Sequence, residues 1–70
     1  MGKLPGISHQ RAVKALQRAG FVVARESGHI VLVKGELTVI VPRNNPVNPY
    51  TMYGIVIAAG LTVDEFRYLL

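Results

Sequence analysis

The chain has 70 residues, half of them apolar, which excludes a disordered segment and limits residues 1–70 to a single domain with one small core. It has no cysteine, so disulfides, thiolate metal sites and a cysteine nucleophile are excluded. Lysine and arginine total 8 against 4 acidic residues, and the net charge of +4 favours RNA, DNA or an acidic protein as a partner.

The first seven residues do not read as a signal peptide, because they are few and include two glycines and a proline. No apolar stretch approaches the roughly 20 residues that span a bilayer. We therefore expect a cytoplasmic protein with no membrane partner.

The first predicted element is a helix over residues 8–19. Ser8 is suited to cap the free amides of its first turn, and Gly20 is suited to the position that follows its end. Apolar and basic side chains fall on opposite sides of this helix. The basic side consists of Arg11, Lys14 and Arg18. A solvated outer face accounts for it without any ligand.

Three strands are predicted next, because the following segments are rich in β-branched and aromatic residues and are separated by short turns. They are residues 21–26, 29–34 and 37–41. The first turn is Ser27-Gly28, and the second, Gly35-Glu36, has the leading glycine that a type II′ hairpin turn prefers. The strands therefore form an antiparallel meander.

A loop over residues 42–50, with three prolines and three asparagines, excludes a further central strand. We expect a second helix over residues 51–59, capped by Thr51, and a short third helix over residues 63–70, capped by Thr62. The class is thus α+β, in the order α-β-β-β-α, with a three-stranded antiparallel sheet and the longer helices on one face. The expected core includes Val13, Leu16, Phe21, Ile55 and Leu61. The other sheet face is left open to a second copy, a partner protein or the loop.

The phrase LQRAGF at residues 16–21 is followed by a strand and then by Ser27-Gly28-His29. The series continues through Val41-Pro42, Thr51, Ile55 and residues 59–62. In order and spacing it resembles the HicA family of bacterial toxins, over about residues 7–70. The resemblance implies a fold like that of double-stranded RNA-binding domains, cleavage of messenger RNA, and neutralisation by an antitoxin, HicB. It also implies that a histidine after a glycine, here His29, is required for activity.

The chain departs from the family pattern in its second helix. Members often carry basic residues there, whereas this helix has no charged residue and presents Tyr53 and Ile57, four positions apart on one helical face. This departure favours a protein contact through Tyr53 and Ile57, made with an antitoxin or with a second copy.

His29 suits metal-independent RNA cleavage, because histidine exchanges protons near neutral pH and the ribose 2′-hydroxyl supplies the nucleophile. Developing phosphate charge needs cations nearby, and Arg25, Lys34 and Arg43 are the candidates for RNA binding. His9 is expected to be a first-turn surface residue. Two distant histidines and scattered acids do not form a metal site, so we expect no metal and no cofactor.

Other interpretations stay open. A strand histidine is often structural, and the chain would then be a non-catalytic RNA-binding or antitoxin-binding domain of the same fold, a degenerate toxin. Tyr50 and Tyr53 are able to stack on bases, but packing of the loop and the helix is the favoured explanation for them.

Overall fold

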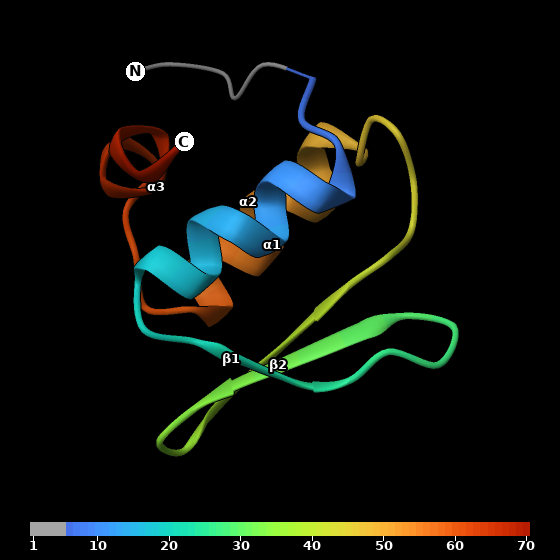
Figure 1. Cartoon of the computed structure of the whole chain (residues 1–70). Coiled ribbons are helices and arrows are strands. Elements are labelled where there is room, and N and C mark those ends of the chain that lie inside the picture. The colour runs from blue at the N-terminus through green and yellow to red at the C-terminus, as the bar shows by residue number, and fades with distance from the viewer. Residues whose placement is uncertain (1–5) are drawn as a thin grey trace.

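The computed structural model describes residues 6–70, and its elements follow the expected order (Figure 1). The helices and strands are α1 (His9–Arg18), β1 (Val22–Arg25), β2 (Ile30–Lys34), β3 (Leu37–Val41), α2 (Pro49–Ala58) and α3 (Val63–Leu69). The strands form an antiparallel sheet in the order β1-β2-β3, which confirms the α+β class. The expectation about a signal peptide falls largely on residues 1–5, which lie outside the described residues.

Helix α1 begins and ends where the sequence predicts. The Ser8 hydroxyl accepts a hydrogen bond from the Arg11 amide at 3.2 Å, which satisfies a free amide of the first turn. Beyond the other end, Gly20 has a φ of 103°, and the Phe21 amide donates to the Leu16 carbonyl at 3.0 Å. This is a Schellman turn, which glycine makes possible.

The β2–β3 hairpin also has the predicted turn. Gly35 has a φ of 58°, and no described residue other than glycine has a positive φ, so Gly35 and Glu36 show the φ signs of a type II′ turn. The β1–β2 pairing is less regular, because its register shifts between Val23 and Arg25. Such a bulge turns the end of β1 and adds local twist.

Helix α2 starts earlier than the sequence predicts. Its N-cap is Asn48, whose side chain accepts a hydrogen bond from the Tyr50 amide at 2.9 Å, and Pro49 is the first helical residue. The prediction of Thr51 as the cap is therefore wrong. Proline disrupts a helix interior but is favoured at the first position, where its missing N–H is not needed.

Helix α3 has the predicted cap. The Thr62 hydroxyl accepts from the Glu65 amide at 3.1 Å, and the Glu65 carboxylate accepts from the Thr62 amide at 2.8 Å, which together form a capping box. The guanidinium of Arg18 donates to the carbonyls of Leu69 and Leu70 at 2.6 and 3.2 Å. The end of α3 is thereby joined to the end of α1.

The helices cover one face of the sheet. Figure 1 shows α1 and α2 above the strands, and α3 packs against both helices. Leu16, Phe21 and Ile55 are buried as expected, whereas Val13 and Leu61 are only partly buried at the edge of the core. The centre of the core combines residues of all three helices with β2 and β3; its largest side chains are Phe66, Ile7, Leu16, Leu32, Met52, Val41, Val47 and Val56.

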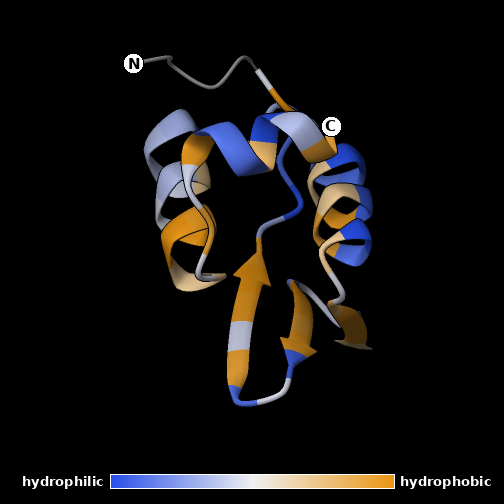
Figure 2. Cartoon of the chain, turned by 90° about the vertical axis from the view of Figure 1, so that its left-hand side faces the viewer, coloured by the Kyte–Doolittle hydropathy of each residue, from blue (hydrophilic) through white to orange (hydrophobic). Residues whose placement is uncertain are grey.

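The other face of the sheet is open within the described part of the chain. The strands are hydrophobic along most of their length (Figure 2), because both alternating sets of side chains are largely apolar. Val22 and Ile40 are 60% and 52% exposed on this face.

Candidate active site

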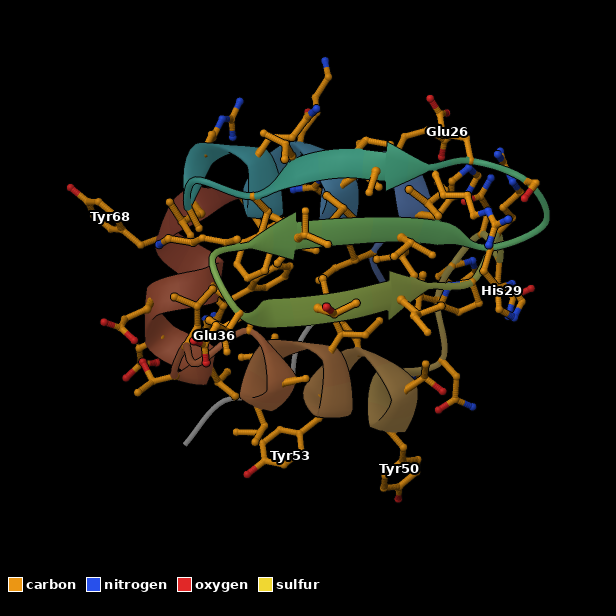
Figure 3. The ribbon with its side chains drawn as sticks, turned by 90° about the horizontal axis from the view of Figure 1, so that it is seen from below. Glu26, His29, Glu36, Tyr50, Tyr53 and Tyr68 are labelled. Atoms are coloured by element: carbon orange, nitrogen blue, oxygen red, sulfur yellow. The ribbon has the colours of Figure 1, made fainter. Side chains whose placement is uncertain are left out.

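His29 lies at the end of the sheet where the chain turns from β1 into β2, and its side chain is exposed (Figure 3). We expected it to begin the second strand, but β2 begins at Ile30, so this boundary is wrong. Ile30 pairs with Val41, and the next pair would join His29 to Pro42, which has no N–H to donate. The histidine is therefore presented on a turn.

Gly28 shapes the backbone immediately before the histidine. Its φ of 71° lies in the left-handed region, which glycine adopts at little cost. Residues 26–29, named the His29 turn below, are all exposed. An imidazole in this position is accessible both to solvent and to a large substrate.

Arg43 contacts the His29 turn from the loop that follows β3. Its Nε donates to the Gly28 carbonyl at 2.6 Å, and its Nη2 donates to the Glu26 carbonyl, also at 2.6 Å. The sequence predicts Arg43 as an RNA-binding residue, and the structure adds a contact with the protein's own backbone. A guanidinium consequently lies beside the residue that precedes His29.

Arg25 lies on the open face of the sheet near the same end. It pairs with Val31 after the bulge in β1, and its side chain is exposed. Side chains of paired residues project from the same face, so Arg25 shares the face of Val31. Arg25 and Arg43 are thus the basic residues that the fold places around the His29 turn.

Lys34 is separated from the histidine by the length of β2. At about 3.3 Å per residue, the strand places the two residues at opposite ends of the sheet. The Lys34 ammonium donates to the Ala19 carbonyl at 2.7 Å and lies 5.9 Å from the centre of the Phe21 ring. The structure thus does not bring this predicted RNA-binding residue to the site, and Lys34 instead holds the C-terminus of α1.

Tyr53 and Ile57 are both exposed on α2, by 54% and 53%. Because the helix begins at Pro49, Tyr50 joins them on the same side, one turn earlier, and is 89% exposed. Figure 3 shows Tyr50 and Tyr53 pointing away from the sheet, with Tyr50 at the same end of the molecule as His29. These three residues are named the α2 stripe.

The loop before α2 is held by contacts that the sequence did not predict. The backbone amide and the Nδ1 atom of His9 lie 3.0 and 2.8 Å from Oδ1 of Asn45. The Val47 amide donates to the Ile7 carbonyl at 2.8 Å. His9 is in the first turn of α1 as expected, but it also joins that helix to the loop that carries Arg43.

Within residues 6–70, no three His, Cys, Asp or Glu side chains gather as they would to hold a metal ion. No helix in that part of the chain is long and apolar enough to cross a membrane.

The described site combines one exposed imidazole on a turn at the edge of the protein with two guanidinium groups from the end of β1 and from the loop after β3. An imidazole transfers protons near neutral pH, and guanidinium groups bind phosphate oxygens. In comparisons with known proteins, no protein-family model, no curated protein and no solved structure matches the chain.

Proposed function

We propose that the protein is an mRNA interferase, a metal-independent endoribonuclease toxin of a toxin–antitoxin pair that acts in the cytoplasm, as the resemblance to the HicA toxins implies. The observation that carries the proposal is the exposed His29 on its glycine turn, next to the guanidinium of Arg43. We also propose that the α-β-β-β-α order corresponds to the fold of double-stranded RNA-binding domains.

The proposed reaction needs only proton transfer and charge stabilisation. The ribose 2′-oxygen attacks the adjacent phosphorus, the bond from phosphorus to the 5′-oxygen breaks, and the products end in a cyclic phosphate and a 5′-hydroxyl. His29 either accepts the proton of the 2′-hydroxyl or donates one to the leaving 5′-oxygen, and water carries out the other proton transfer. The histidine contributes roughly 10²- to 10⁴-fold in rate. Arg25, which shares the open face of the sheet with Val31, is the candidate whose charge would stabilise the phosphate.

The test is cleavage of RNA by the wild-type protein and by His29→Ala. We expect the variant to lose at least about 100-fold in rate, since its acid–base group is missing. It should fold normally and keep its affinity for RNA, because His29 is exposed and phosphate contacts come from other residues. Induced expression should arrest growth only for the wild type.

His9→Asn is the matched control, because it removes the other imidazole of the chain, keeps a side-chain amide that is able to donate to Asn45, and should leave cleavage intact. Cleavage by His29→Ala at the wild-type rate would contradict the catalytic assignment. If the wild-type protein binds RNA but does not cut it, the chain is instead a non-catalytic RNA-binding domain.

The α2 stripe supports a second proposal, which is compatible with the first. Two tyrosines and an isoleucine are exposed on a helix without charged residues, whereas solvated helix faces are normally polar. Aromatic side chains of this kind are enriched in protein interfaces. We propose that the α2 stripe binds a HicB-like antitoxin, and a second copy of the chain is the alternative occupant.

A further inference from the structure

The His29 turn has little to hold it in place apart from Arg43. The β2–β3 ladder ends at Ile30, and the β1–β2 ladder ends at Arg25, so residues 26–29 lie outside both ladders. All four residues are exposed, and a side-chain carbon at Gly28 would meet no atom within 4 Å. Neither strand pairing nor packing therefore fixes the backbone next to the histidine.

The two hydrogen bonds of Arg43 supply that restraint. They reach the carbonyls of Glu26 and Gly28, which lie on either side of Ser27, from a residue 17 and 15 positions further along the chain. Among the described residues, no other hydrogen bond outside the ladders connects the turn to the rest of the protein. A planar guanidinium that donates through two nitrogen atoms restricts both the distance and the orientation of the turn.

The segments immediately before and after Arg43 are both fixed by contacts with the rest of the protein. Val41, before it, is fully buried at the end of β3. After it, Asn45 is bonded to His9, and the Val47 amide donates to the Ile7 carbonyl at 2.8 Å. The restraint therefore runs from the start of α1, through the loop, to the turn that carries His29.

We propose that Arg43 is a positioning residue, which holds the His29 turn so that the imidazole is presented in one orientation to the RNA. The proposal rests on the proposed ribonuclease function. It differs from the direct RNA contact that the sequence suggests for Arg43, because the side chain acts here through the carbonyls of the protein. Misplacement of a catalytic group by about 1 Å can reduce the rate by about 100-fold.

The experiment compares Arg43→Ala, Arg43→Lys and the control Arg67→Ala by measuring kcat and KM on a defined oligoribonucleotide. Arg67→Ala removes the same charge from an exposed position on α3, so it should behave like the wild type. For Arg43→Ala we expect kcat to fall by about 10- to 100-fold, with KM nearly unchanged. Arg43→Lys keeps the charge but lacks the planar pair of donors, so it should remain as slow as the alanine variant.

A second measurement does not depend on RNA. Hydrogen exchange and ¹⁵N relaxation of the Gly28 and His29 amides should show a more mobile turn in Arg43→Ala and Arg43→Lys, with the rest of the sheet unchanged. Full recovery of kcat by lysine, a rise in KM alone, or an equally ordered turn in the alanine variant would overturn the positioning role. If the wild-type protein does not cleave RNA, the proposed function fails, while the amide measurements still decide whether Arg43 orders the turn.

Discussion

At the scale of single residues, Gly28 and Gly35 form a natural pair for comparison. Both have a positive φ, of 71° and 58°, and neither has an atom within 4 Å of the place where a side-chain carbon would lie. The penalty for a larger residue at either site is thus conformational and not steric crowding. Gly28 precedes the histidine, whereas Gly35 lies in the turn at the opposite end of β2.

We predict that Gly28→Ala and Gly35→Ala each lower the free energy of unfolding by about 1–2 kcal/mol, the cost of a left-handed alanine. Urea denaturation measures this loss. Only Gly28→Ala should also slow RNA cleavage, because the turn that presents His29 must change shape. Equal cleavage rates for the two variants at matched folded fractions would show that the backbone before the histidine does not matter for activity.

At the scale of elements, the start of α2 shows how a cap is chosen. Asn48 and Thr51 are both suitable cap residues, and the sequence alone favours Thr51 because prolines precede it. The structure selects Asn48, since Pro49 fits the first helical position and adds a turn to the helix. That added turn also brings Tyr50 onto the helix surface.

We predict that Asn48→Ala lowers the free energy of unfolding by about 1 kcal/mol, because it removes the acceptor for the Tyr50 amide. Thr51→Ala should not lower the stability, since Thr51 is exposed in the first turn of α2 and alanine has the higher helix propensity. Chemical denaturation of the two variants measures this difference. A lower midpoint for Thr51→Ala than for Asn48→Ala would show that Thr51, and not Asn48, caps the helix.

Caps, turns and alternation are local signals, and so the strands, α1 and α3 could be predicted from the sequence. The partners of Lys34 and Arg43 could not, because backbone carbonyls distant in sequence come within reach only when the chain has folded. Both side chains carry a charge that suggests RNA, yet both also donate to the protein backbone. The sequence placed His29 within one residue of its observed position at the start of β2, because the glycine before it marks the turn.

At the scale of the whole molecule, the apolar surface is distributed unevenly. One layer of helices covers one side of the sheet, while Val22 and Ile40 on the open face and the α2 stripe remain exposed. The stripe adjoins the end of the molecule that carries His29 (Figure 3). A partner bound along α2 would therefore lie close to the candidate active site.

We predict that Tyr53→Ser combined with Ile57→Ser weakens binding of the proposed HicB-like antitoxin by about 10-fold or more, since exposed aromatic anchors dominate such interfaces. Titration calorimetry measures the loss. Tyr68→Ser is the control, because Tyr68 is 92% exposed on α3. The double variant should retain RNA cleavage. Unchanged affinity for the antitoxin would show that the interface does not include Tyr53 and Ile57. Size-exclusion chromatography shows whether a second copy occupies the stripe instead.

The contact between the ends of α1 and α3 has a consequence for folding. Phe66 of α3 is fully buried, and Arg18 of α1 donates hydrogen bonds to the carbonyls of Leu69 and Leu70. The three strands pair with their neighbours in sequence and are able to form early. The core, however, is complete only when α3 has packed onto α1 and α2. A chain in which α3 has not yet docked therefore exposes the apolar sides of α1 and α2, and such surfaces are the ones that chaperones bind.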